Sequence, residues 1–241
     1  MTTSRLLRFD DRTDLVAQTA TRLVEAMTTI QAKNQSVSVC LTGGGLANDI
    51  YAQVALRSER LTASRIHLWW NWDYYIATDN PDRNSLQALT RLAGVLALDP
   101  AKIHPIPSLS AATDPEVGAV AYAHELLESP AIDICLLELG SHGQIAGVFP
   151  QHLNCLTSDP VIGITDAIAA YPELITLTPS GLNACHEIWV MASGDDVASH
   201  LKQIFSQDPE QPGSHLTQSE SLLWLADSAA TSQLDFHHCS L

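Results

Sequence analysis

Short apolar runs alternate with longer amphipathic segments along most of the chain, and this alternation constrains the fold more than any other feature. The first three runs lie at 36–41, 66–72 and 132–139; the first is followed by Thr42 and three glycines, and the third by Gly140. Four more follow, at 161–164, 174–178, 188–192 and 222–225. Short runs of this kind are typical of buried strands, so they predict a largely parallel sheet.

The segments between these runs have helical periodicity. Apolar residues recur at spacings of four and three at Val16, Ala20, Leu23, Met27 and Ile30, which marks one face of a helix. Further helices are predicted at 48–60, 84–97, 115–128 and 195–206. Alternating strands and helices predict an α/β fold of Rossmann-like type, with a mostly parallel central sheet flanked by helices on both faces.

The length and the absence of long linkers favour one domain. A chain of 241 residues suits a single large α/β domain. No internal repeat is visible, and the Pro/Gly-rich stretch 207–215 is interpreted as a surface loop. We therefore expect one domain over residues 1–241.

Charge and cysteine content exclude several classes of partner. The formal net charge is −15, from 27 acidic and 12 basic residues, so we expect no binding to nucleic acid or to an anionic membrane surface. The five cysteines show no CxxC spacing, which favours reduced thiols. We expect a cytoplasmic protein, because no apolar run is long enough to span a membrane and residues 1–14 lack the features of a signal peptide.

Three predicted strand ends have an unusual composition, and sites form at strand ends in open α/β sheets. Thr42-Gly43-Gly44-Gly45 follows the first run, and a glycine loop before a helix is a candidate anion cradle. His142 lies between Gly140 and Gly143 after another run. The segment 69–75 holds five aromatic residues, which suit core packing or an interface, or a stacking platform for a sugar.

Six blocks in order, at 41–45, 71–84, 136–152, 163–184, 193–198 and 223–227, carry a resemblance. They resemble the 6-phosphogluconolactonase family, which shares its fold with the glucosamine-6-phosphate isomerases. Residues 41–45 resemble the start of its phosphate loop L-S-G-G-S-T-P, and residues 71–84 (NWDYYIATDNPDRN) resemble D-E-R-x-V-P-x-D-x-P-x-S-N. Residues 136–152 (LLELGSHGQIAGVFPQH) resemble L-L-G-M-G-x-D-G-H-T-A-S-L-F-P-G-H. The blocks at 163–184, 193–198 and 223–227 match in the same order.

The resemblance implies hydrolysis of 6-phospho-D-glucono-1,5-lactone to 6-phosphogluconate, a reaction of the pentose phosphate pathway and of carbohydrate metabolism. In the family, the His of D-G-H serves as the general base, and Gln144 occupies that position here. Gln cannot accept a proton near neutral pH. The D-E-R residues become Trp72, Asp73 and Tyr74, and the family's later Arg and Lys become Leu174 and Val197.

The family's substrate carries a phosphate of about −1.5 to −2 at pH 7, which requires paired cations. Three of the family's cationic positions are neutral here, at Tyr74, Leu174 and Val197, whereas Arg83 is a gained cation. Each charge-assisted contact contributes roughly 1.5–3 kcal/mol, so the loss of three predicts weak binding of phosphosugars.

Three interpretations remain open. The chain is an inactive copy retained for binding or regulation, a pseudoenzyme. Alternatively it is a rewired lactonase, in which His142 and Asp73 recreate a general base and Arg83 holds phosphate. In the third interpretation it is a hydrolase that acts on an uncharged substrate.

We expect the pocket to persist as a cleft with aromatic and apolar walls, because its glycines are kept. The expected lining is Thr42, Gly43, Gly44, Gly45, Leu46, Trp72, Asp73, Tyr74, Arg83, Asn84, His142, Gly143, Gln144, Leu174 and Val197. We expect no cofactor and no metal, since HExxH and paired CxxC spacings are absent and His237-His238-Cys239 stands alone. The expected ligand is small and sugar-like, and a protein partner or a homodimer is also considered.

Overall fold

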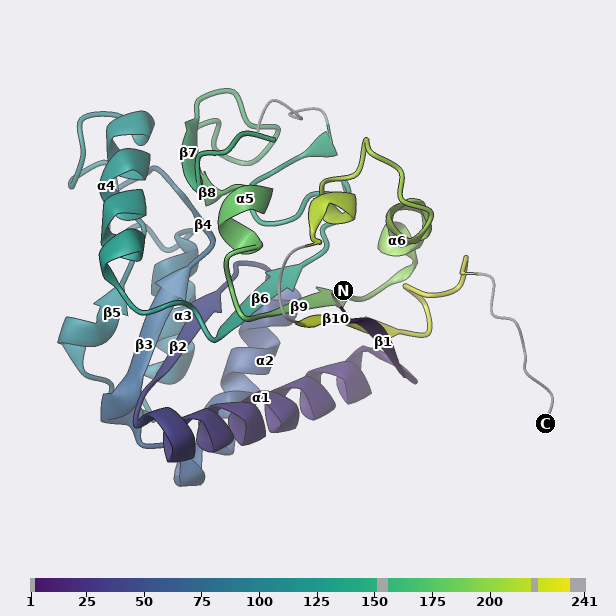
Figure 1. The fold of residues 1–241 in the computed structure, drawn as a ribbon, viewed down its shortest axis with the longest axis horizontal. Helices are drawn as coiled ribbons and strands as arrows, with labels where there is room; N and C mark the ends of the chain where they lie inside the picture. Colours follow the sequence, from purple (N-terminus) through teal and green to yellow (C-terminus); the bar gives the residue numbers. More distant parts are fainter. Residues whose placement is uncertain (1–2, 151–155, 218–220, 235–241) are drawn as a thin grey trace.

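A computed structural model describes residues 3–150, 156–217 and 221–234. Its centre is a seven-stranded sheet in which all pairings are parallel (Figure 1). In spatial order the strands are β1 (Thr3–Phe9), β10 (Ser221–Asp227), β9 (Glu187–Ala192), β6 (Ile134–Glu138), β2 (Val37–Leu41), β3 (Ile66–Trp70) and β5 (Ile103–His104). The predicted α/β class with a parallel central sheet is confirmed.

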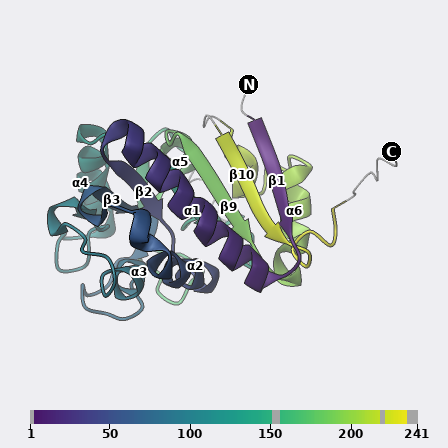
Figure 2. The same ribbon diagram turned by 90° about the horizontal axis from the view of Figure 1, so that it is seen from below.

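Helices cover both faces of this sheet (Figures 1 and 2). One layer contains α1 (Arg12–Asn34), α2 (Gly45–Leu56) and α3 (Asn84–Leu92), and α2 contacts both of the others. The opposite layer contains α4 (Pro115–Glu128), α5 (Pro179–Leu182) and α6 (Ala198–Phe205). Single 3-10 turns lie at η1 (Ser58–Arg60), η2 (Ala63–Arg65), η3 (Pro100–Lys102), η5 (Asp195–Val197) and η6 (Pro212–His215).

Helix α1 shows how the local sequence sets these elements. The Asp11 side chain caps its start by accepting a hydrogen bond from Asp14 N at 2.9 Å. The predicted apolar face is buried from Val16 to Met27, and the helix ends at Gln35, which has a left-handed φ of 66°. Its buried face packs against the central sheet in the main hydrophobic core.

A second sheet of three antiparallel strands corrects part of the sequence prediction. It contains β4 (Trp72–Tyr74), β8 (Leu174–Leu177) and β7 (Val161–Ile164), in the order β4-β8-β7. The runs at 161–164 and 174–178 were predicted to join the parallel sheet, which is wrong. Only residues 165–173 connect β7 to β8, and a parallel pair needs a longer crossover.

The run predicted at 66–72 is also divided between the two sheets. It breaks at Asn71, whose N–H donates to Leu41 O at 2.9 Å and whose carbonyl accepts from Leu177 N at 2.7 Å. Asn71 therefore links the large sheet to the small one. The strands predicted near 36–41, 66–71 and 132–138 are confirmed as β2, β3 and β6, whereas β1 and β5 were not predicted.

The order of the strands reverses between β2 and β6. The chain proceeds outward from β2 through β3 to β5 on one side, and from β6 through β9 and β10 on the other. Cys40 of β2 pairs with Cys135 of β6. Gly43 and Glu138 each lie three residues beyond these cysteines, so they reach the same edge of the sheet. In such folds this reversal point is where ligands bind.

The stretch 207–215 is more ordered than a simple surface loop. It includes η6, and Gln211, Pro212 and Gly213 are buried. Gln211 Nε2 donates to Gln203 Oε1 at 2.9 Å, which ties the stretch to α6. Within the described ranges, no helix is both long and apolar enough to cross a membrane.

Candidate functional site

The glycine loop after β2 is shaped by close packing as well as by backbone conformation. Gly44 precedes α2 with φ of 122°, which other residues resist. A side chain on Gly43 would collide with the amide of Asn84, and one on Gly44 would collide with the carboxylate of Glu138. Thr42 is buried, and its N–H and carbonyl both bond to Tyr51 Oη at 2.9 Å. The loop is therefore fixed on three sides.

Glu138 is the side chain that lies directly against this loop. Its Oε2 accepts a hydrogen bond from Ala47 N in the first turn of α2 at 3.0 Å. Burial raises the pKa of Glu138 from 4.5 to about 7, although the amides of Ala47 and Leu46 and the Arg12 guanidinium lower it. A carboxylate of the chain itself thus occupies the start of α2, where the backbone amides favour an anion.

Arg12 is a cation close to the same loop. Its Nη2 lies 3.9 Å from the position that a side chain on Gly45 would take. Its Nη1 lies 2.5 Å from Asp49 Oδ2, and both side chains of this pair are about half exposed. Solvent screens such a pair. Arg12 therefore remains accessible to an anion that approaches Gly45.

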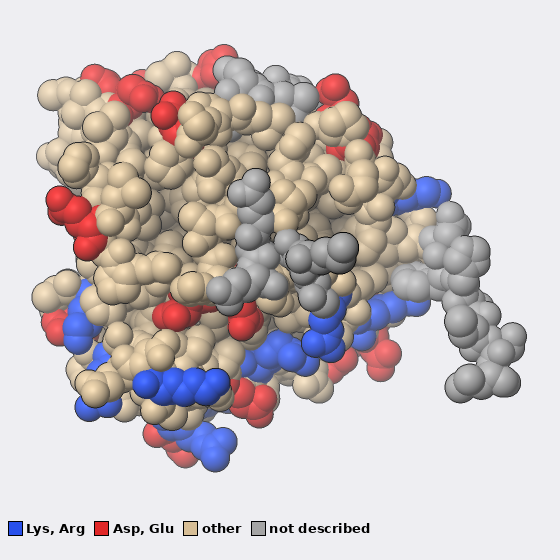
Figure 3. Space-filling model, viewed as in Figure 1, with Lys and Arg blue, Asp and Glu red and all other residues tan. Residues whose placement is uncertain are grey.

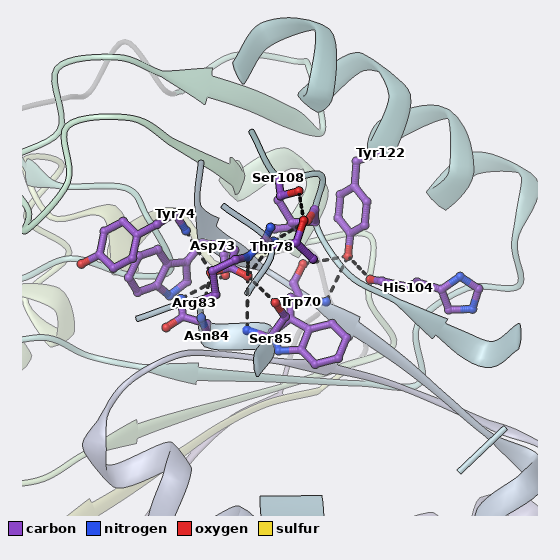
Figure 4. Close-up of polar contacts among 12 residues, drawn as sticks. Trp70, Asp73, Tyr74, Thr78, Arg83, Asn84, Ser85, His104, Ser108 and Tyr122 are labelled. Atoms are coloured by element: carbon purple, nitrogen blue, oxygen red, sulfur yellow. Dashed lines mark hydrogen bonds and ion pairs between the residues drawn. The ribbon is translucent and has the colours of Figure 1, made fainter. Parts of the chain in front are cut away.

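Asp73 of β4 and Arg83, just before α3, form a buried ion pair (Figure 4). Arg83 Nε and Nη2 donate to Asp73 Oδ2 at 3.0 and 2.9 Å, and Nη2 also donates to Ile106 O at 2.5 Å. The two residues are 0% and 1% exposed, respectively. The prediction that Arg83 faces a ligand is therefore corrected, because its guanidinium is turned into the protein.

Both oxygens of the Asp73 carboxylate accept hydrogen bonds from neighbouring residues. Beyond Arg83, it accepts from the N–H groups of Tyr74 and Asn84 at 2.9 and 2.8 Å, and from Ser85 N and Oγ at 3.2 and 2.7 Å. Asn84 and Ser85 begin α3, so the carboxylate also stabilises that helix start. Asp73 holds the loop before α3 in place.

The loop of residues 140–144 contains Gln144, which stands where the family has its general-base His. Gln144 Oε1 accepts from His142 N at 3.0 Å, and its carboxamide packs so closely on Gly140 that a side chain there would displace it. Gly143 has φ of 77° and adjoins the His200 and Gln211 side chains. His142 is exposed, and its Nδ1 lies 3.4 Å from Ser141 Oγ.

The structure does not bring His142 and Asp73 together. No hydrogen bond joins them in the described part of the chain, and the donors to the Asp73 carboxylate there all come from residues 74–85. Leu174 and Val197, expected in the pocket wall, are 0% and 2% exposed. They belong to the hydrophobic interior, because an apolar side chain without a ligand is most stable when buried.

The aromatic segment 69–75 divides into two roles. Trp69 and Trp70 are core residues, and Trp69 stacks on His104 with ring centroids 3.9 Å apart. Trp72 and Tyr74 are only partly buried, and each aromatic ring in the row Trp72, Tyr74 and Tyr171 meets the next edge-on at 5.1 Å. Trp72 and Tyr74 belong to β4 of the small sheet, and Tyr171 lies in the segment between β7 and β8.

Among the described residues, no group of three His, Cys, Asp or Glu side chains is placed to hold a metal ion. His237-His238-Cys239 lies outside the described residues, as do Cys155 and Cys239 of the five cysteines. Cys40, Cys135 and Cys185 are buried free thiols.

Sequence reasoning missed Glu138 and Arg12. The signal for Glu138 was a single carboxylate near the end of the apolar run 132–139. Its partner Ala47 is 91 residues away, so only the pairing of β2 with β6 reveals the contact. Arg12 gave no signal, because it starts a helix far from the glycine loop in sequence.

The parallel sheet, the switch point and the glycine loop define an α/β protein of the sugar-phosphate isomerase type. A family model described as "Glucosamine-6-phosphate isomerases/6-phosphogluconolactonase" matches residues 10–224. The chain belongs to this family. It is 32% identical to a 6-phosphogluconolactonase of Streptomyces coelicolor, over 96% of this chain and 95% of that protein.

Other relatives agree with this assignment. The 6-phosphogluconolactonase of Mycobacterium leprae is 27% identical, over 94% of this chain and 96% of that protein. The crystal structure of the Thermotoga maritima 6-phosphogluconolactonase superposes with a TM-score of 0.84 at 18% identity, covering 93% of this chain and all of that one. The superposition confirms the predicted fold type.

Proposed function

We propose that this chain is a 6-phosphogluconolactonase-family protein in which hydrolysis of 6-phospho-D-glucono-1,5-lactone is lost or greatly weakened, and which serves as a binding protein for a ligand without phosphate. The observation that carries this proposal is at residue 144. The side chain there is an amide whose oxygen accepts from the backbone of His142 at 3.0 Å. It cannot act as a general base.

The arrangement of charge supports the same proposal. Leu174 and Val197 are buried, and the Arg83 guanidinium is neutralised by Asp73. The Lys and Arg side chains visible in Figure 3 gather mainly on the part of the surface over α1 and its neighbours, while the region around α4 and the small sheet is acidic or uncharged. A phosphate dianion at the glycine loop would meet the half-exposed Arg12, which is already paired with Asp49, and not the several cations that its burial requires.

The rewired lactonase has less support. It needs Asp73 beside His142, and therefore the loss of hydrogen bonds from Arg83, Asn84 and Ser85. Each such bond to a charged group contributes about 1.5–3 kcal/mol, so the rearrangement would strongly destabilise the folded protein. Action on an uncharged substrate does not need that pair, and remains the second candidate because His142 is exposed beside Ser141.

The aromatic row favours a sugar-like ligand. Trp72, Tyr74 and Tyr171 offer a row of partly exposed rings. Aromatic faces bury the apolar side of a sugar ring, while nearby amides such as Asn84 orient hydroxyl groups. A cytoplasmic location, a protein partner and a homodimer stay predictions.

Hydrolysis of the phosphorylated lactone, corrected for the spontaneous reaction, tests the proposal. Loss of a general base lowers the rate by about 10²–10⁴, so we expect little activity above background. A turnover number near the typical value of ~10 per second would contradict the proposal. His142→Ala is then the matched variant, since its inactivity would identify a rewired base.

Calorimetric titration with 6-phosphogluconate tests binding separately from catalysis. We expect affinity in the millimolar range or weaker, at about −4 kcal/mol or less favourable. Micromolar affinity that depends on Arg83 would show that the site accepts phosphate after all.

A further inference from the structure

We propose that Glu138 is the residue that decides anion specificity at this site: its carboxylate occupies the backbone cradle at the start of α2 and closes it to external anions such as phosphate. The inference rests on the proposed function, because it supplies a physical reason for the rejection of phosphate. It concerns one side chain, and its test does not involve catalysis.

The first reason is geometric, because the Glu138 carboxylate already fills the cradle. Ala47 N points at Glu138 Oε2 at 3.0 Å, and the amide of Leu46 acts on the same carboxylate. Gly44 has no side chain, and any side chain there would occupy the space of the carboxylate. The carboxylate therefore fills the volume next to the amides that an external anion would have to enter.

The second reason is the negative charge of Glu138. An ionised Glu138 would repel a phosphate dianion at contact distance, and solvent screens that repulsion less in this partly buried setting than at an open surface. The charged or titratable groups that act on Glu138 are Arg12 of α1, and Asp49 and Tyr51 of α2. Only Arg12 is a cation, and it is shared with Asp49 at 2.5 Å.

The third reason is that the surroundings of Glu138 compensate its charge incompletely. Its pKa is raised to about 7 because burial outweighs the amide hydrogen bonds and the Arg12 guanidinium. The charge of the carboxylate is thus less fully compensated than that of a fully paired one. Removing it should leave a cradle with free amides and a nearby cation, which together suit a small oxyanion.

The test titrates inorganic phosphate into the full chain at pH 8, where Glu138 is mainly ionised, and follows the backbone amides of residues 44–47 by NMR. Wild type is expected to show no saturable change up to tens of millimolar phosphate. Glu138→Ala, which removes charge and bulk, is expected to bind about tenfold more tightly or better. Glu138→Gln removes the charge and keeps the bulk, so its affinity should lie between the two.

Adding Arg12→Ala to Glu138→Ala should reverse most of the gain, because the remaining cation is lost. Saturable phosphate shifts at residues 44–47 in wild type, or a Glu138→Ala variant that binds phosphate no better, would overturn the proposal. If that variant fails to fold, the isosteric Glu138→Gln decides the matter by the same comparison.

A pH titration without phosphate checks the position of the carboxylate. The amide shifts of Leu46 and Ala47 should follow a titration that Glu138→Gln abolishes, and shifts that are indifferent to this substitution would sink the proposal. A wild type that hydrolyses the phosphorylated lactone would contradict the proposed function. An unchanged phosphate affinity in the Glu138 variants would contradict only the present inference.

Discussion

Asp73 and Glu138 are both carboxylates at the start of a helix, Asp73 fully buried and Glu138 partly buried, and their surroundings differ sharply. Asp73 accepts hydrogen bonds from the first residues of α3 and is paired with the buried guanidinium of Arg83. Glu138 accepts from Ala47 in the first turn of α2, and its cation Arg12 is about half exposed and shared with Asp49. Similar chemical groups in similar backbone settings thus meet very different degrees of compensation.

The difference shows that a helix start does not by itself stabilise a buried charge. The macrodipole and free amides contribute up to ~2 kcal/mol, which is less than the cost of taking a carboxylate out of water. Asp73 recovers that cost through many donors and a full ion pair. Glu138 does not, so the pKa of its carboxyl is raised to about 7. The first is a structural clamp, and the second is a group that can change state near neutral pH.

The largest expected effect is the loss of the clamp. Arg83→Met leaves Asp73 buried without its cation, so the free energy of unfolding should fall by about 3–5 kcal/mol. Urea denaturation measures it. The double variant Asp73→Asn with Arg83→Met should be less unstable than the sum of the two single variants. A loss below ~1 kcal/mol for Arg83→Met would show that the pair is not a clamp.

A smaller effect is the pH dependence that Glu138 introduces. The folded protein holds its proton up to about pH 7, whereas an ordinary glutamate releases it near 4.5. Its stabilising contribution is therefore complete below about pH 4.5 and is lost as the pH rises to about 7. This amounts to about 3 kcal/mol at most.

Glu138→Gln provides the matched control for this pH dependence, because the other titrating groups are unchanged. As the pH rises from 4.5 to 7, wild type should lose unfolding free energy that this variant keeps, so the variant becomes more stable relative to wild type. Parallel stability curves for the two proteins would refute the raised pKa.

Gly44→Ala should have a moderate effect. The new methyl group would meet the Glu138 carboxylate and force an alanine to φ of 122°, at a cost of about 1–3 kcal/mol. In a Glu138→Ala background the loss should shrink, because only the backbone strain remains. Gly45→Ala is the control, since it lies in the first turn of α2 with its nearest neighbour 3.9 Å away, and it should be neutral or slightly stabilising. Equal losses at the two glycines in thermal unfolding would argue against the contact.

The smallest effect concerns the exposed ion pair near the loop. Asp49→Ala removes the partner of Arg12, and a half-exposed pair contributes less than ~1 kcal/mol to stability. The same substitution removes an anion that raises the pKa of Glu138, so that pKa should fall slightly. Denaturation and the NMR titration of Leu46 measure the two results. A decrease in unfolding free energy as large as that of Arg83→Met would show that the exposed pair stabilises the fold as much as the buried pair does.

Much of the fold follows from local sequence, but the assignment of strands to sheets does not. The apolar run of β2 and the spaced apolar residues of α1 predict those elements correctly, because periodicity records which side of an element is buried. The pattern could not show that the chain changes sheets at Asn71, because both parts of that run are apolar. The two-residue β5 is too short to leave a pattern.

For the site, the sequence by itself determined the positions where chemistry is missing and the glycines that shape the loops. Gln144, Leu174 and Val197 can be seen without coordinates, since the inability of a side chain to carry charge is a property of its atoms. The tertiary structure alone decided which charged groups meet. Asp73 pairs with Arg83, ten residues away, and Glu138 meets the loop before Ala47, 91 residues away. These contacts depend on strand order and on burial, because electrostatic energies inside a protein are set by distance and by the loss of water, and neither is written in the local sequence.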